Sequence, residues 1–220
     1  TTEIYTLSLH DALPIWFNPN LESRWFIVPG IVALLAMIVT LVVTSLSVAR
    51  EREAGTFDQL LVTPLHPWEI LIGKAMPGLI VGVGEASLII AVTVFWFEVP
   101  LVGKLSVLYP ALIIYVLSII GVGLMISSFS ATLQQALLGS FLFIVPAVIL
   151  SGFSTPIANM PPFMQTLTYL DPMRYFLSIV RRVFLEGAGL EYFIHDLWPM
   201  SLIALITLSL ATWLFRHRMY

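Results

Sequence analysis

The sequence predicts an all-α fold: a polytopic transmembrane helical bundle with five spanning helices, a re-entrant outer helical hairpin and a short cytoplasmic coupling helix. Hydrophobic residues make up 59% of the 220 residues and charged residues only 10%, and the mean hydropathy is +0.96. A soluble domain of this size could not bury so much apolar surface. The few charged residues fall between long apolar runs, as expected for membrane-spanning helices.

Charge, cysteine content and motifs exclude several classes of protein. The net charge is −3, and no basic face indicates nucleic-acid binding. The chain has no cysteine, and its histidines lack ligand spacing, so we expect neither disulfides nor a Cys-based zinc site. Neither a phosphate-binding glycine motif nor a catalytic constellation is present. We therefore expect no catalytic, cofactor or metal site in this chain.

Five stretches are apolar enough to cross a bilayer, which takes roughly 20 residues of helix. In chain order they are residues 26–48, 70–97, 105–129, 134–150 and 197–215. Residues 1–15 lack the basic and apolar parts of a signal peptide and resemble a translated adaptor sequence. We expect them to be a non-native leader, and residues 16–220 to form one transmembrane domain.

Basic residues near the span ends predict the orientation of the bundle. Arg50, Arg52 and Lys74 flank the segment after the first span, and Arg216 and Arg218 follow the last span. The four crossings between these groups place both on one side, which we expect to be the cytoplasm. The other side then carries Arg24, Lys104, Arg174, Arg181 and Arg182. Three of these lie in the long segment 151–196, where the rule is less dependable.

The polar segment 50–69 between the first two spans has a readable local structure. Gly55 allows the first helix to end, and Thr56 with Gln59 matches a capping box that begins another helix. Pro64 ends it, so a short amphipathic helix is expected at residues 57–63. Such a helix can seat in a groove of a partner and transmit force. The alternative is an interfacial helix that lies on lipid.

The same segment carries a resemblance to a known family. Residues 50–64 read RERE-AGTFDQLLVTP and are followed by PWEILIGK. Together with WFNP at 16–19, LSGF at 150–153 and YLDPMRY at 169–175, these residues are similar to the signature of ABC-type-2 exporter permeases. In that family the matching loop is the coupling element on a nucleotide-binding ATPase subunit. The resemblance therefore implies coupling residues Arg50, Glu51, Arg52, Glu53, Gly55, Thr56, Phe57, Asp58, Leu60, Leu61 and Pro64.

The resemblance also implies partners and a location. The partners would be an ATPase subunit that binds the ATP, a second permease copy, the lipid bilayer and a periplasmic adaptor protein. The location would be the bacterial inner membrane, with several crossings and a cytoplasmic C-terminus. Permeases of this family have six spans, so the spans here resemble the last five, and we expect an N-terminally truncated gene.

Residues 151–196 are too polar for a span and too apolar for a free loop. A short helix is expected at 163–170, and Asp171 before Pro172 predicts the start of a second one at 173–186. Its apolar face comprises Met173, Phe176, Leu177, Val180 and Phe184. Because non-helical backbone at membrane depth must be buried or line a cavity, we expect a re-entrant pair of helices at the outer face.

Two sets of charged residues are candidates for the transport pathway. Arg174, Arg181 and Arg182 lie near one face of the second outer helix; they could bind lipid headgroups or form a gate or substrate contact. Glu85 lies about midway along the second span, where a carboxylate is expensive. It could hydrogen-bond a hydroxyl such as Tyr115 or Ser118, line the pathway or couple to protons.

Three classes of function follow from these observations. The resemblance favours an ABC exporter permease that moves a hydrophobic or amphipathic substrate, such as a drug, lipid or glycan, out of the cytoplasm. A secondary transporter would use Glu85 as an ion-coupling carboxylate and would usually show an internal repeat, which is not evident here. A membrane-embedded enzyme would need paired catalytic groups, and the sequence offers none.

Overall fold

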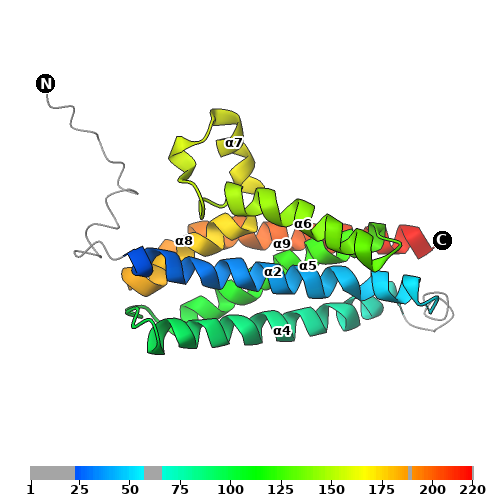
Figure 1. Cartoon of the computed structure of the whole chain (residues 1–220), viewed down its shortest axis with the longest axis horizontal. Helices are drawn as coiled ribbons and strands as arrows, with labels where there is room; N and C mark the ends of the chain where they lie inside the picture. The colour runs from blue at the N-terminus through cyan, green and yellow to red at the C-terminus, as the bar shows by residue number, and fades with distance from the viewer. Residues whose placement is uncertain (1–22, 57–65, 188–189, 220) are drawn as a thin grey trace, which may run out of the picture.

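The computed structural model describes residues 23–56, 66–187 and 190–219, and every regular element in these ranges is a helix. The long helices are α2 (Ser23–Glu53), α4 (Pro67–Phe95), α5 (Leu105–Phe129), α6 (Leu133–Leu150) and α9 (Leu190–Met219). All five are long and apolar enough to cross a membrane, and they run side by side along the long axis of the molecule (Figure 1). The predicted all-α bundle with five spanning helices is confirmed.

Two helices extend furthest beyond the predicted spans. The first continues through Glu53, so residues 50–53 are helical and do not belong to a loop. The last begins at Leu190 and takes in the end of the predicted outer segment. Sequence reasoning cut both helices at the first charged residues, but Glu and Arg are good helix formers and the backbone hydrogen bonds do not require apolar side chains.

The second long helix begins at a proline. Pro67 is the first residue of α4, a position at which the missing N–H of proline is tolerated. The backbone N–H of His66 donates a hydrogen bond of 2.8 Å to the Glu69 carboxylate. The preceding polar segment is therefore followed directly by a well-defined helix start.

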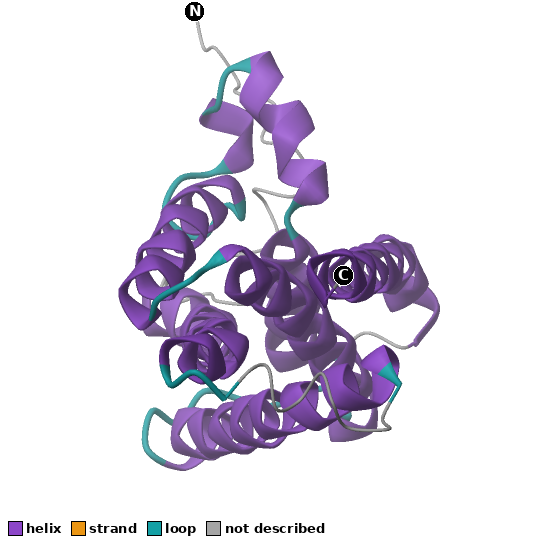
Figure 2. Cartoon of the chain, turned by 90° about the vertical axis from the view of Figure 1, so that its right-hand side faces the viewer, coloured by secondary structure: helices purple, strands orange, loops and turns teal. Residues whose placement is uncertain are grey.

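α5 is the central helix of the bundle. It contacts α2, α4, α6, α8 and α9, and its side chains at Leu112, Ile119 and Leu124 are almost completely buried. Figure 2 shows the long helices nearly end-on, from the end of the bundle that carries the C-terminus. α6 and α9 instead expose large apolar side chains such as Leu142 and Leu205. Side chains of this kind suit a lipid or protein environment, not water.

Glycines allow α2 to pack closely against two neighbours. A Cβ added to Gly78 of α4 or to Gly123 of α5 would overlap the side chain of Thr44. One added to Gly82 would overlap the hydroxyl of Thr40. Gly78 and Gly82 therefore let α4 approach α2 closely within the chain.

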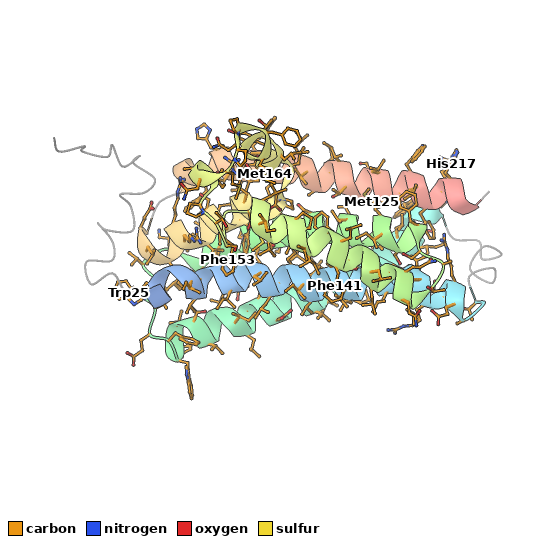
Figure 3. All side chains as sticks on the ribbon, turned by 45° about the horizontal axis from the view of Figure 1, so that its top comes forward. Trp25, Met125, Phe141, Phe153, Met164 and His217 are labelled. Carbon is orange, nitrogen blue, oxygen red and sulfur yellow. The ribbon has the colours of Figure 1, made fainter. Side chains whose placement is uncertain are left out.

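The outer segment contains four short elements between α6 and α9. They are η1 (Ile157–Asn159), α7 (Pro162–Leu167), η2 (Thr168–Leu170) and α8 (Pro172–Leu185). α7 projects away from the bundle (Figure 1). Figure 3 labels Met164 on this projecting part and Phe153 at its base, where the Phe153 ring leaves no room for a Cβ on Gly30 of α2.

α8 returns to the bundle and packs against α2, α5 and α9. Its predicted apolar face is confirmed, because Met173, Phe176, Leu177, Val180 and Phe184 are at most 2% exposed. Asp171 caps the helix as predicted, with Oδ1 accepting a 3.0 Å hydrogen bond from the backbone N–H of Met173. That this segment re-enters the membrane stays a prediction.

Candidate coupling site and outer segment

One polar end of the bundle, which we call the inner end, is formed by one end of each of the five long helices. The C-terminus of α2, the start of α4, the α5–α6 turn and the C-terminus of α9 all lie at the end marked C in Figure 1. Arg50, Arg52, Lys74 and Arg216 belong to these helix ends. Four of the five basic residues that predicted a common side therefore share one end of the molecule, and its assignment to the cytoplasm stays a prediction.

α2 ends in the way that Gly55 predicts. Gly55 has a φ of 70°, which glycine adopts without the steric cost that other residues incur. The backbone N–H of Thr56 and its hydroxyl both donate to the carbonyl oxygen of Glu51, at 3.0 and 3.3 Å. Thr56 thus closes the last turn of α2. The predicted capping box involves Gln59, which lies outside the described residues.

An ion pair joins α2 to α4. The Lys74 ammonium group contacts the Glu51 carboxylate, and the Lys74 side chain is only 10% exposed. A cation with so little access to water needs a partner of opposite charge. Glu51 provides it, while its second carboxylate oxygen is buried without a hydrogen-bond partner among the described residues.

The next two residues bind the turn between α5 and α6. A guanidinium nitrogen of Arg52 donates to the carbonyl oxygens of Ser128, at 2.7 Å, and Ser130, at 3.3 Å. The Glu53 carboxylate accepts a 2.6 Å hydrogen bond from the backbone N–H of Leu133. A helix C-terminus favours a cation and a helix N-terminus an anion. Arg52 and Glu53 therefore meet the two helix ends that match their charges.

Further hydrogen bonds connect the inner half of α2 to the same two helices. The Ser127 hydroxyl of α5 accepts from the backbone N–H groups of Val48 and Ala49, at 2.9 and 3.1 Å. The Ser140 hydroxyl of α6 donates to the Ser45 hydroxyl of α2 at 2.7 Å. The attachment of α2 thus extends for about two helical turns beyond its charged end.

The structure places only part of the predicted coupling site. Glu51, Arg52 and Glu53 contact three different helices, and the Arg50 side chain is exposed at the surface. The predicted helix at 57–63 lies outside the described residues, as do Phe57, Asp58, Leu60, Leu61 and Pro64.

Sequence reasoning missed the partners of this charged run: Lys74, Ser128, Ser130 and Leu133. Lys74 was used in the sequence analysis only to predict the orientation of the bundle. One signal in the sequence could have indicated such partners, because successive residues on a helix point about 100° apart. Four consecutive charges on one helix, residues 50–53, must therefore face several neighbours.

Glu85 lies beside the exposed face of α4. Its Oε2 atom is buried without a hydrogen-bond partner among the described residues. A hydrogen bond to Tyr115 or Ser118, one of the alternatives for Glu85, is not formed, because Tyr115 donates to the carbonyl of Ala33 and Ser118 to those of Ile114 and Met200. Hydroxyls in apolar helices commonly satisfy themselves on backbone carbonyls in this way.

The three outer arginines do not act as one group in this structure. Arg174 donates to the Thr168 hydroxyl, and its guanidinium lies 4.2 Å from the centre of the Tyr169 ring. Arg182 forms an ion pair of 3.6 Å with Asp196 of α9. Burial lowers the pKa of Arg181 to about 10. Arg174 and Arg182 therefore contact different elements, η2 and α9.

Asp171 is the most deeply buried carboxylate at the outer end among the described residues. Its side chain is 5% exposed, and burial raises its pKa to about 7, against the lowering effects of the Met173 N–H and Arg174. Its Oδ2 atom has no hydrogen-bond partner among the described residues. The carboxyl group therefore holds a proton more readily than an exposed aspartate does.

Five apolar helices of spanning length, four of them packed around the buried central helix α5, define a multi-pass membrane protein. The sequence matches the ABC-2 type transporter family over residues 8–185. The chain belongs to this family. The match begins inside the segment 1–15, and the leader predicted there stays a prediction.

Curated relatives carry permease names. The chain is 45% identical over 203 residues to the probable multidrug ABC transporter permease YbhR of Escherichia coli (strain K12), covering 92% of this chain and 55% of that protein. It is 39% identical over 177 residues to the probable multidrug ABC transporter permease YbhS of the same organism, covering 78% and 46%. It is 31% identical over 189 residues to the inner membrane transport permease YhhJ, also from that strain, covering 84% and 49%. The chain spans about half the length of these relatives.

Proposed function

We propose that this chain forms the membrane-spanning part of an ABC exporter permease. It moves a hydrophobic or amphipathic substrate, such as a drug, a lipid or a glycan, out of the cytoplasm. A separate subunit binds and hydrolyses the ATP, because the chain has no nucleotide-binding motif of its own. The observation that carries this proposal is the inner end of α2 in a chain that belongs to the ABC-2 type transporter family. At this end, the helices next to the polar segment are joined to one another by an ion pair and hydrogen bonds.

The two helices that flank residues 57–65 support a coupling role. α2 runs without interruption to Glu53, and α4 begins at Pro67, so each end of the intervening segment continues into a helix of spanning length. A force applied to the segment acts directly on both helices. The ATPase subunit is the partner that could apply such a force when it binds and hydrolyses ATP.

The remaining partners and the location follow from family membership as proposals. The inner end faces the cytoplasm, which gives a cytoplasmic C-terminus, and the membrane is a bacterial inner membrane. A second permease copy completes the transporter, and a periplasmic adaptor protein joins the outer end. Drug-like substrates are favoured because the two YbhR and YbhS relatives are named as probable multidrug permeases.

Glu85 is the favoured pathway residue. A carboxylate in the middle of a span normally faces a partner or a watery cavity, and its Oε2 has no hydrogen-bond partner among the described residues. The same observation supports the second candidate function, a secondary transporter in which Glu85 couples substrate movement to protons or cations. Arg174 and Arg182 are weaker pathway candidates, since both already contact neighbouring side chains.

Association with an ATPase subunit tests the proposal. The chain, produced together with a candidate ABC ATPase subunit, should retain that subunit through purification in detergent. Joint replacement of Phe57 and Leu61 by Ala should abolish the association. Phe163→Ala is the matched control, since Phe163 lies on α7 and is 74% exposed. Failure of the unaltered chain to retain any ATPase subunit would contradict the proposal.

A further inference from the structure

Three consecutive charged residues at the end of α2 each contact a different helix. Glu51 pairs with Lys74 of α4. Arg52 binds the carbonyl oxygen of Ser128 at the end of α5, and Glu53 binds the first N–H of α6 at Leu133. We call these three contacts the inner clamp. The inner clamp links four of the five long helices at the end of the bundle where the polar loop emerges.

The contacts within the inner clamp restrict the ability of its side chains to bind a partner protein. Lys74 is 10% exposed and the Glu51 side chain 29%, and Arg52 is partly buried while it spans two carbonyl oxygens. A partner protein that bound these charged groups would first have to break the contacts that offset the energetic cost of removing the groups from water. Arg50 differs, because its side chain is exposed and makes no hydrogen bond or ion pair with a described residue.

α6 is the helix for which the inner clamp matters most. Its outward face is exposed along its whole length, at Leu138, Leu142 and Val145 among others. Its main helix neighbour is α2. Apart from packing, two hydrogen bonds between described residues join the two helices: Glu53–Leu133 at the inner end and Ser140–Ser45 two turns further in. Displacement of the end of α2 therefore pulls on α6 through these hydrogen bonds.

We propose that Glu51, Arg52 and Glu53 are positioning residues that make the inner ends of α2, α4, α5 and α6 move as one body when the loop after α2 is displaced. Arg50 and Glu53 are the exposed charges at 50–53, and Arg50 is the one of them that makes no hydrogen bond or ion pair with a described residue, so Arg50 contacts the ATPase subunit. The inference rests on the proposed function, which supplies the ATPase subunit that displaces the loop. It separates binding of that subunit, through Arg50 and the loop, from transmission of its movement, through the inner clamp.

The first test separates binding from transmission. Arg52→Met and Glu53→Ala each remove one contact of the clamp, and Arg50→Met removes an exposed charge of the same type. In the complete transporter, the two clamp variants should bind the ATPase subunit within about twofold of the unaltered protein and hydrolyse ATP, but move much less substrate per ATP. Arg50→Met should weaken binding instead. If Arg52→Met weakens ATPase binding by about tenfold or more, as loss of a buried interface charge does, the proposal is wrong.

A charge exchange tests the ion pair without depending on folding of a single variant. Glu51→Lys and Lys74→Glu each place like charges together and should reduce substrate moved per ATP. The double variant restores opposite charges and should recover most of the loss, which is the signature of a direct interaction. If the double variant is as poor as the worse single variant and remains folded, the ion pair does not position these helices.

A third measurement works without any ATPase subunit. The chain has no cysteine, so cysteines introduced for spin labels at the exposed positions Ala54 and Ala131 would be its only ones. The distance between the labels should be narrowly distributed in the unaltered chain and broader in Glu53→Ala. An equally narrow distribution in both proteins would overturn the clamp. If the unaltered chain binds no ATPase subunit, the proposed function fails, while this measurement still decides whether the clamp exists.

Discussion

The Thr44 hydroxyl of α2 occupies the space that a Cβ on Gly123 of α5 would need. The same Thr44 side chain also excludes a Cβ at Gly78 of α4. One threonine thus lies between two glycines from different helices. Small residues of this kind let membrane helices approach closely, so the inner half of the bundle depends on the absence of side chains at these two positions.

Gly123→Ala should destabilise the protein. The added methyl group overlaps Thr44, and overpacking of this kind costs about 1–3 kcal/mol. Thermal unfolding in detergent measures the effect. Gly84→Ala is the control, because a Cβ at Gly84 meets nothing within 4 Å and alanine is the better helix former. Equal loss of stability in both variants would contradict the close packing.

Phe176→Ala tests whether α8 is packed inside the bundle. The Phe176 ring is fully buried and stacks on Tyr115 of α5, with ring centres 4.4 Å apart. Removal of such a ring costs about 3–5 kcal/mol. Phe163→Ala on the projecting α7 should change the free energy of unfolding by less than about 0.5 kcal/mol. A helix that merely lay on the membrane surface would make the two variants alike.

The stability of the protein should depend on pH through Asp171. Its pKa is about 7 in the fold against 3.8 for a free side chain, so between these values the folded state binds more protons than the unfolded state. The contribution of Asp171 is therefore fully present below about pH 4 and declines as the pH rises towards 7.

Asp171→Asn is the variant that tests this dependence. Asparagine is also a good N-cap, so the variant should unfold at nearly the same temperature at pH 5 and pH 8, whereas the unaltered protein should be less stable at pH 8. Unfolding temperatures at the two pH values measure the difference. A decline of the same size in Asp171→Asn would show that another group titrates.

Local sequence signals predicted two helix ends correctly. Gly55 ends the first long helix and Asp171 caps α8, because each signal acts through its own backbone. The apolar face of α8 could also be predicted, since the helical spacing of its apolar residues places Phe176 and Val180 on one side.

Contacts between distant residues could not be predicted in the same way. Glu53 binds Leu133 across 80 positions of sequence, and nothing in the local pattern of either residue names the other. For the same reason the sequence could not show that Tyr115 donates its hydroxyl to Ala33, 82 positions earlier. The hydrogen bond that was one of the alternatives for Glu85 is therefore not formed, although the span that carries Glu85 was correct.

Glu85→Gln should reduce export without reducing stability. No hydrogen bond from Oε2 to a described residue is lost, so the unfolding temperature should stay the same, while a pathway that uses the charge should transport less. Export of a fluorescent amphipathic dye from cells checks the first effect and thermal unfolding the second. The control is Glu98→Gln in the α4–α5 loop, which should change neither. A large fall in the stability of Glu85→Gln would indicate a structural role instead.

The most direct measurement is dye uptake into inside-out membrane vesicles that contain the complete transporter. With the ATPase subunit present, an amphipathic dye should accumulate when ATP is added, and removal of either ATP or the ATPase subunit should stop it. Dissipation of the proton gradient should have no effect. Accumulation that a proton gradient drives without ATP, and that Glu85→Gln abolishes, would contradict an ATP-driven exporter and identify a secondary transporter.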